Sequence, residues 1–178
     1  MTSLLTKLLE LSHKEHIRVV YDTSYDAYDR KVINSKLSGQ TSLLICVISE
    51  EKVFGYYTES QVPRDDDTWK AVGVANAFAF IYDESGFRLE RSRSCESCLY
   101  INVDNDDDEI LLSVRHFFFL RREKSYLSGK FNQFFGFLNK EVCYPYYIHI
   151  QNVIIYKLYY LFLSFCKIIG QILDLLFF

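Results

Sequence analysis

Two cysteines separated by two residues, Cys95 and Cys98, have the spacing in this chain that most resembles a chemical site. A Cys-x-x-Cys pair serves in thiol redox sites and supplies half of the ligands of a structural zinc site. Zinc would need two more ligands, and the remaining candidates, His116, Cys143 and His149, form no second close pair. A thioredoxin-like site has its motif at a helix start, whereas this pair lies between predicted strands. We therefore interpret Cys95 and Cys98 as incidental thiols, with a redox role as the alternative.

An acidic run at residues 104–109 invites comparison with a calcium-binding loop. Its alternate aspartates fit the first, third and fifth positions of an EF-hand loop. That loop also needs Gly at its sixth position and Glu at its twelfth, where this sequence has Glu109 and Arg115. The run is therefore better explained as a solvated turn, and we predict no metal site.

Other residue types that could form a site are dispersed. His13 and His16 lie near the end of a predicted helix but supply only two metal ligands. A basic surface could form from Arg88, Arg91, Arg93, Arg121, Arg122 and Lys124. It is diluted by Glu84, Glu90, Glu96 and Glu123, which favours a mixed solvent-facing surface. The sequence contains no G-x-S-x-G, H-E-x-x-H, P-loop or G-x-G-x-x-G motif. We therefore expect neither an enzyme nor a cofactor-binding protein.

The overall composition indicates one folded domain with a short extension. The chain has 178 residues, of which 49% are hydrophobic and 24% charged, a balance that disfavours both disorder and a polytopic membrane protein. Aromatic residues reach 17% while Pro is limited to 2, which favours a sheet-rich core. A net charge of −3 gives no general attraction to nucleic acid.

Two features indicate a cytoplasmic location. Residues 1–10 lack the long apolar run and the small-residue cleavage site of a secretory signal. The cysteines are odd in number and scattered over the chain, unlike those of a secreted disulfide framework. We therefore expect reduced thiols and a protein that stays in the cytosol.

Hydrophobic periodicity predicts the elements that would position any site. Leucines at helical spacing predict a helix over 4–11 with Ser3 as its N-cap, and a second helix is predicted over 26–36, ending before Gly39. Alternating and β-branched segments predict strands at 17–21, 99–103, 110–120 and 146–157, and two hairpins, 43–48 with 53–58 and 77–82 with 87–90. Residues 59–75 are predicted to form a long crossover loop.

Residues 158–178 differ in kind, so we divide the chain into a domain at 1–157 and an apolar C-terminal tail. The few polar residues of the tail are spaced three or four apart and would form one narrow stripe on a separate helix. Lys167 and Asp174 would each be costly near the middle of a bilayer, so a membrane-surface or packed helix is as well supported as a span. The composition of the tail also fits translated AT-rich non-coding DNA, which would make it a gene-model artefact.

The order of these elements, and the residues within them, resembles the TLDc domain family. That family opens with a strand, a Ser-x-Asp turn and a helix, followed by a TLLxI strand, an FGGY hairpin return and a Phe-x-Phe strand. The corresponding positions of this chain hold Ser24, Asp26, Phe54, Gly55, Tyr57, Phe78 and Phe80. The likeness is best over residues 17–82, and residues 146–157 resemble the closing strand of the family. The chain departs from the pattern at Ala27 and Tyr56, where the family has Gly, and it lacks the aromatic-glycine ending of the family's closing strand around residues 154–156.

The resemblance implies an α+β fold, a β-sandwich of two antiparallel sheets flanked by a few helices. It implies structural roles for the matched residues: Gly55 would mark a close backbone approach within a strand, and Ser24 or Asp26 would cap the following helix. It further implies a non-catalytic domain of the kind found in oxidation-resistance proteins and in regulators of the vacuolar proton ATPase.

We therefore expect a cytoplasmic protein-interaction domain that modulates the vacuolar proton ATPase or oxidative-stress resistance and that can lie at the periphery of an endomembrane. A nucleic-acid partner and a cofactor are not expected. Two alternatives from other classes stay open. One is a thiol-dependent antioxidant that uses Cys95 and Cys98, and the other is a membrane-associated adaptor held by residues 158–178.

Overall fold

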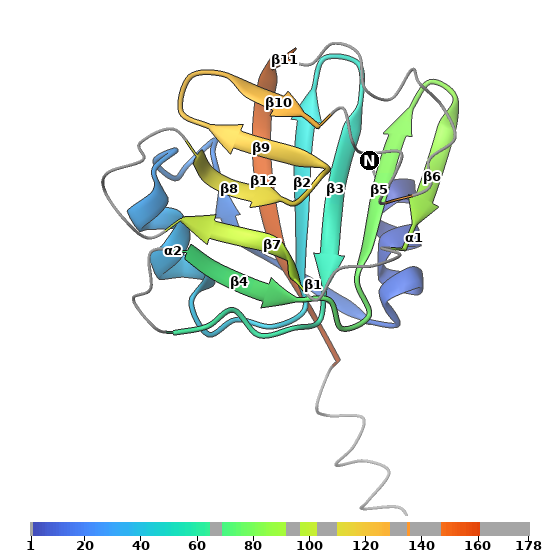
Figure 1. Cartoon of the computed structure of the whole chain (residues 1–178). Coiled ribbons are helices and arrows are strands. Elements are labelled where there is room, and N and C mark those ends of the chain that lie inside the picture. The colour runs from blue at the N-terminus through green and yellow to red at the C-terminus, as the bar shows by residue number, and fades with distance from the viewer. Residues whose placement is uncertain are drawn as a thin grey trace, which may run out of the picture.

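In the computed structural model, two antiparallel β-sheets pack face to face and helices flank them (Figure 1). The structure describes residues 2–64, 69–91, 97–102, 110–128, 135 and 147–160. The described helices are α1 (Thr2–Ser12) and α2 (Arg30–Leu37), and the described strands are β1 (His16–Asp22), β2 (Leu43–Ser49), β3 (Val53–Thr58), β4 (Trp69–Gly73), β5 (Phe78–Asp83), β6 (Gly86–Glu90), β7 (Ser97–Asn102), β8 (Ile110–Val114), β9 (Phe118–Arg121), β10 (Ser125–Leu127), β11 (Tyr147–Ile148) and β12 (Ile150–Tyr159).

The last strand of the chain lies inside a sheet and not at its edge. The first sheet has the order β1-β12-β2-β3-β5-β6, so β12 separates β1 from β2, and the second sheet has the order β11-β10-β9-β8-β7-β4. Neighbouring described strands are antiparallel, and the strands of the two sheets run across one another in Figure 1. The predicted β-sandwich of two antiparallel sheets is therefore confirmed.

Aromatic rings fill much of the core between the sheets. The ring of Phe54 on β3 lies 5.7 Å from that of Phe117 and 5.5 Å from that of Phe118. Phe118 begins β9 of the second sheet, and Phe117 lies in the turn before it. The ring of Phe135 packs 5.6 Å from Phe117. Ring pairs at such distances contribute about 1 kcal/mol beyond the area they bury. The high aromatic content of the sequence thus serves the contact between the two sheets.

Helix α1 covers the outer face of the first sheet. Its Leu4 and Leu8, one helical turn apart, are buried in a second apolar cluster with Phe78 and Phe80 of β5. Strands such as β2 are consequently buried on both faces, and Leu44 of β2 points to α1 while its neighbours face the other sheet. This double burial explains why the β2 sequence is apolar at consecutive positions.

The first predicted helix is confirmed, with different ends. It begins at Thr2, so Ser3 lies within the helix and the prediction of Ser3 as N-cap is wrong. It ends because His13 adopts the left-handed backbone conformation, with φ at 55°. The N–H of Lys14 then donates a hydrogen bond to the carbonyl of Leu9 at 3.1 Å, which closes the last turn.

Helix α2 begins later than predicted. Asp29 is its N-cap, with an extended backbone and a side-chain oxygen that accepts a hydrogen bond from the N–H of Lys31 at 2.8 Å. The prediction that Ser24 or Asp26 caps this helix is therefore wrong. The predicted end is confirmed, because Gly39 follows the helix with φ at +73°.

Both predicted hairpins are confirmed. Strands β2 and β3 pair with Ile45 opposite Tyr56, and strands β5 and β6 pair with Tyr82 opposite Phe87. The turn of the second hairpin ends in Gly86, whose φ of +105° favours glycine. In both cases the partner strand is close in sequence, so local alternation and turn residues were sufficient to predict the pairing.

The segment predicted as a long crossover loop contains a strand. Strand β4 forms the edge of the second sheet and pairs with β7, Val72 lying opposite Leu99. Its Lys70 side chain is buried, and the Nζ atom lies 3.2 Å from the hydroxyl of Ser38. The prediction of a loop over 59–75 is therefore wrong for Trp69–Gly73, where the sequence carries only a weak strand pattern because a lysine occupies a buried position of a short edge strand.

Two predicted strands are each divided. Residues 110–120 form β8 and β9, which turn back at His116, where φ is 60°. The run contains neither Gly nor Pro, so no sequence signal marks this turn. The predicted strand at 146–157 falls into β11 and β12, which belong to different sheets. The chain therefore crosses from one sheet to the other at His149.

Strand β12 continues past the residue at which the tail was expected to begin. Leu158 is buried in the cluster beneath α1, and Tyr159 pairs with His16. The helix predicted for the tail falls beyond Tyr160, outside the described residues. Within the part of the chain that the structure describes, no helix has the length and apolar character needed to cross a membrane.

Gly55 provides a test of the packing between β2, β3 and β5. A Cβ atom at this position would lie 1.9 Å from the backbone oxygen of Ile45 and 2.7 Å from the ring of Phe80. Because neither group can move aside freely, we expect Gly55→Ala to lower the free energy of unfolding by about 3 kcal/mol. Gly73→Ala is the matched control, since its Cβ would meet only the side chain of Ser60. Urea unfolding compares them, and equal losses would contradict this account.

Candidate functional site

The described cysteines lie in the interior. Cys98 on β7 is fully buried in the core between the sheets, and Cys95 lies outside the described residues. Cys46 on β2 is buried beneath α1, and burial raises the pKa of its thiol to about 12. A reactive cysteine needs both thiolate character and access, so neither described position favours thiol chemistry.

The residues considered as metal ligands lie apart. His13 ends α1, and His16 begins β1 with its ring 5.6 Å from that of Tyr159. The acidic run at 104–109 lies outside the described residues. Among the residues that the structure describes, no three His, Cys, Asp or Glu side chains gather as a metal site would require.

The residues that carry the TLDc resemblance meet on two neighbouring strands. Strand β3 holds Phe54, Gly55 and Tyr57, and strand β5 holds Phe78 and Phe80. In the pairing register Gly55 lies opposite Phe80 and Tyr57 opposite Phe78, whose rings are 5.0 Å apart. Phe54 faces the other sheet, whereas the remaining aromatic residues pack beneath α1. Gly55 leaves room for the Phe80 ring, so this unit positions α1 on the sheet.

The turn that contains Ser24 and Asp26 is tied to the closing strand. The carboxylate of Asp26 accepts a hydrogen bond from the N–H of Asp22 at 3.0 Å and pairs with Lys36 at 2.5 Å. The amide of Asn152 on β12 donates to the carboxylate of Asp22 at 3.1 Å and to the hydroxyl of Ser24 at 2.9 Å. These contacts give Ser24 and Asp26 a structural role in placing the segment between β1 and α2.

A groove in two parts lies where the chain crosses from β11 to β12. Ile148 and His149 line both parts. The part beside the turn between β2 and β3 also contains Glu50, Glu51 and Lys52, so carboxylates outnumber cationic groups there, and we call it the acidic cavity. The part beside the turn between β9 and β10 contains two arginines, and we call it the basic cavity. The two cavities therefore present opposite charges on either side of one short crossing.

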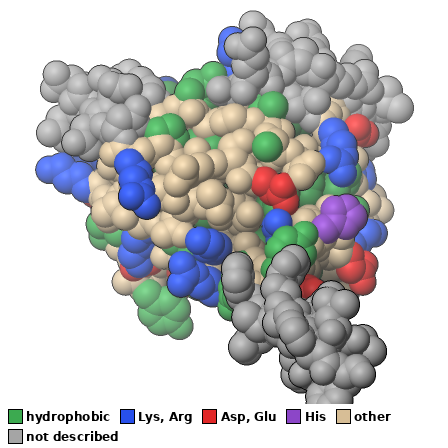
Figure 2. Space-filling view, turned by 90° about the horizontal axis from the view of Figure 1, so that it is seen from below, with side chains coloured by type: hydrophobic (Ala, Val, Ile, Leu, Met, Phe, Trp, Pro, Cys, Tyr) green, Lys and Arg blue, Asp and Glu red, His purple; other side chains and the backbone are tan. Residues whose placement is uncertain are grey.

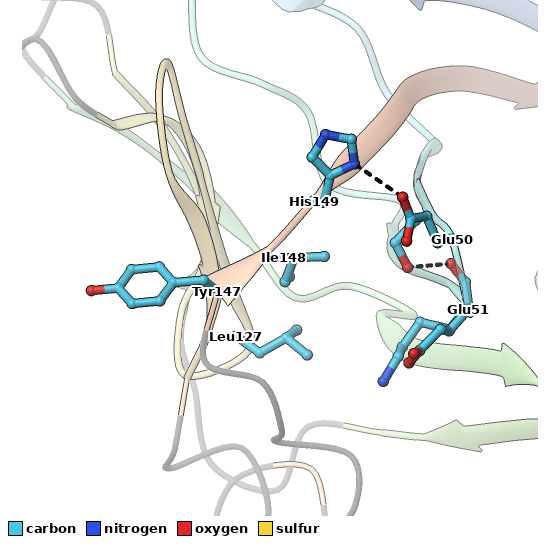
Figure 3. A pocket seen from close by; sticks show the side chains of 8 residues that line it. Glu50, Glu51, Leu127, Tyr147, Ile148 and His149 are labelled. Atoms are coloured by element: carbon cyan, nitrogen blue, oxygen red, sulfur yellow. Dashed lines mark hydrogen bonds and ion pairs between the residues drawn. The ribbon is translucent and has the colours of Figure 1, made fainter.

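The acidic cavity has an apolar floor and a charged rim (Figure 3). Its volume is about 130 Å³, and Leu127 and Ile148 point into it while Tyr147 points away. On the rim, Nδ1 of His149 lies 3.7 Å from Oε1 of Glu50, and both side chains are largely exposed. An apolar cavity of about 150 Å³ holds a benzene-sized group, so this one suits a single apolar side chain.

The basic cavity is larger and more polar. Its volume is about 340 Å³, within the range of roughly 300–1,000 Å³ that is common for ligand sites. Arg121 and Arg122 at the end of β9 line it, together with Ser125, Tyr28 and His149. Burial raises the pKa of the Tyr28 hydroxyl, which therefore stays protonated at neutral pH. This arrangement offers hydrogen-bond donors and positive charge, and it suits an anionic group.

No pattern within the sequence predicts this groove. Its lining comes from segments 49–52, 121–123 and 147–151, with contributions from Ser125 and from the turn after β1. His149 was singled out from the sequence only as a zinc candidate, and the arginines only as part of a mixed surface. The groove exists because β11 and β12 join different sheets, which is a property of topology and not of local periodicity.

No protein-family model matches the sequence, and no curated protein shows significant similarity to it. The likeness to the TLDc family thus consists of the motif residues and their order along the chain, beside the sandwich described above.

The carboxylate of Asp26 gives a pH-dependent test of the turn. Its hydrogen bond with Lys36, and that with the N–H of Asp22, hold its pKa below the ordinary value of 3.8. A lowered pKa in the folded state stabilises the fold above the ordinary value, and this stability is lost as the pH falls through the lowered value. Asp26→Asn should therefore be less stable than the wild type at neutral pH, and the two should converge below about pH 4.

Urea unfolding at a series of pH values measures this convergence. The direction follows from the sign of the pKa shift, because the unfolded chain takes up a proton at a higher pH than the folded one does. If the difference between Asp26→Asn and the wild type stayed constant down to about pH 2, the charge of Asp26 would not be the source of its effect.

Proposed function

We propose that this chain is a TLDc-like protein-interaction domain that catalyses no reaction. In this proposal it modulates the vacuolar proton ATPase or resistance to oxidative stress by binding a protein partner in the cytoplasm. The antiparallel sandwich supports the proposal, because this is the architecture that the family resemblance implies. The motif residues support it further through their positions in the sandwich.

The observation that carries the proposal is the register between β3 and β5. Gly55 lies opposite Phe80, and Tyr57 lies opposite Phe78. These residues are far apart in sequence, yet they form one packed unit beneath α1. Consecutive strands often pair in any antiparallel sheet, so the support comes from the register itself, which places the motif glycine against a motif phenylalanine. The glycine is also required sterically, because a side chain there would meet the β2 backbone.

The positions of the thiols weigh against the antioxidant alternative. A protective thiol must be reached by its oxidant, and it reacts as the thiolate. Cys98, which that alternative requires, is fully buried between the sheets. A role in protection is therefore better explained by contacts with another protein than by cysteine chemistry.

An affinity pull-down from native lysate tests the proposed partner. We expect the immobilised full chain to enrich peripheral subunits of the vacuolar proton ATPase, as identified by mass spectrometry. Beads that carry the heat-unfolded chain are the control, because exposed apolar surface alone captures proteins without specificity. Absence of these subunits from the folded protein's eluate, with folding verified by circular dichroism, would overturn the ATPase partnership.

A specific observation also favours the membrane-adaptor alternative as a second candidate. Arg18 on β1 lies directly opposite Lys157 on β12, near the point where the chain continues into its apolar tail. Figure 2 shows several Lys and Arg side chains on the face seen from this end of the molecule, with Asp and Glu side chains among them. Like charges opposite one another destabilise a sheet, so a nearby anionic surface would relieve their repulsion. Each basic residue beside an anionic bilayer contributes about 1 kcal/mol to binding.

Vesicle co-sedimentation tests this second candidate on the full chain. We expect binding to vesicles that contain phosphatidylserine and little binding to neutral vesicles. Arg18→Gln with Lys157→Gln should weaken binding by about thirtyfold, which corresponds to two charges. Ile168→Asp with Ile172→Asp in the tail should abolish it, because two charges would interrupt the apolar surface of the predicted tail helix. If the tail variant sediments as strongly as the wild type, the tail does not hold the protein at a membrane.

A further inference from the structure

We propose that the groove between β11 and β12 is the surface on which this domain binds its partner, and that the partner presents an acidic peptide segment with an apolar residue beside the acid. The carboxylate of the peptide would bind in the basic cavity. Its apolar side chain would contact the apolar floor of the acidic cavity. This inference rests on the proposed function, because it assumes that the domain works by binding a protein.

The positive charge of the basic cavity comes from two consecutive arginines. Arg121 ends β9, and Arg122 follows it in the turn. The carboxylate among the described lining residues is that of Glu123. The whole chain carries a net charge of −3, so attraction for an acidic segment must arise from a local cluster of this kind.

Arg121 is held in place before any ligand arrives. Its guanidinium lies over the ring of Tyr126, 5.2 Å from the centroid, and that ring is stacked at 4.6 Å on Phe119. The backbone N–H of Arg121 donates to the hydroxyl of Ser125 at 2.9 Å, which fixes the turn that follows. A guanidinium fixed in this way loses little side-chain freedom when it binds a carboxylate through two parallel hydrogen bonds.

Arg122 forms a weak, exposed ion pair within the chain. Its guanidinium lies 3.4 Å from the carboxylate of Asp29, and 55% of the Arg122 side chain is exposed. Exposed pairs of this type contribute about 0–1 kcal/mol, and Asp29 already uses its other oxygen to cap α2. An incoming carboxylate can therefore recruit Arg122 at little cost.

The neighbouring cavity specifies what lies beside the acid. It shares the wall of Ile148 and His149 with the basic cavity, and its floor consists of Leu127 and Ile148. Glu50 at its rim repels a second acidic group from this side. A segment that carries charge throughout would fit less well than one in which an apolar residue adjoins the acid.

Fluorescence polarisation with labelled peptides and the purified full chain tests the proposal. The probes are Glu-Glu-Leu-Ser-Ser, its glutamine counterpart Gln-Gln-Leu-Ser-Ser, and Glu-Glu-Gly-Ser-Ser, which lacks the apolar residue. We expect the first peptide to bind about tenfold more tightly than the glutamine peptide, because charge-assisted hydrogen bonds are lost in the latter. We expect the glycine peptide to bind about fivefold more weakly, because the apolar floor is left unfilled.

Two arginine variants and one lysine variant locate the binding site. Arg122→Gln should weaken binding of the first peptide about tenfold, and Arg121→Gln by a similar factor. Lys124→Gln is the matched control, because Lys124 is exposed in the same turn but does not line the cavity, and it should change binding less than about twofold. Arg122 is exposed, so its variant keeps the test decisive even if Arg121→Gln destabilises the fold.

The outcomes separate this proposal from the proposed function. Equal losses for Arg122→Gln and Lys124→Gln, equal binding of the glutamine peptide, or no binding of the first peptide would each overturn the groove as an acidic-segment site. Arginine-dependent peptide binding without capture of ATPase subunits would support the groove while overturning the ATPase partnership. The wild type and the Arg121→Gln, Arg122→Gln double variant can also be compared in the pull-down. If both capture those subunits equally, the groove is not the partner-binding surface, but the ATPase partnership still holds.

Discussion

The insertion of β12 between β1 and β2 is the constraint on which the rest of the structure depends. Ile155 lies opposite Tyr21 on one side and opposite Ile45 on the other, so one residue of β12 joins two strands that do not pair with each other. The first sheet is therefore incomplete until nearly the whole described chain has been made. Helix α1 depends on the same event, because Leu158 of β12 is part of the buried cluster beneath it. Such long-range pairing delays folding more than it limits stability, because the loop must close before its contacts form.

The groove is a direct consequence of this insertion. To reach its place in the first sheet, the chain must leave β11 in the second sheet, and it does so at His149. Two turns flank that crossing, one carrying Glu50 and the other carrying Arg121 and Arg122. Ile148 and His149 line both cavities, so the wall between the two groups of charged residues is the crossing itself.

Local patterns were sufficient wherever a partner lies nearby in sequence. Both hairpins and the two helices follow from alternation, helical spacing and residues such as Gly39. The predictions fail where tertiary contacts determine the local structure. Lys70 is buried in an edge strand that was predicted as a loop. His116 forms a turn that neither Gly nor Pro marks. Asp29, and not Asp26, caps α2, because Asp26 is committed to the turn before it. The groove could not be predicted at all, since its charged residues come from separate turns that only the position of β12 brings together.

The position of β12 also determines how two surfaces of this molecule are related. The first residue of β12 follows His149 at the groove. Near the other end of the strand, Lys157 lies opposite Arg18, where the chain continues toward its tail. The strand has 10 residues, and at roughly 3.3 Å per residue its two ends are about 30 Å apart. A bilayer that contacts the basic end would therefore leave the groove beyond the reach of its surface charge, because a Debye length is only about 8 Å at physiological ionic strength. The same rigid strand would then hold the groove away from the membrane, where a soluble part of a partner can approach it.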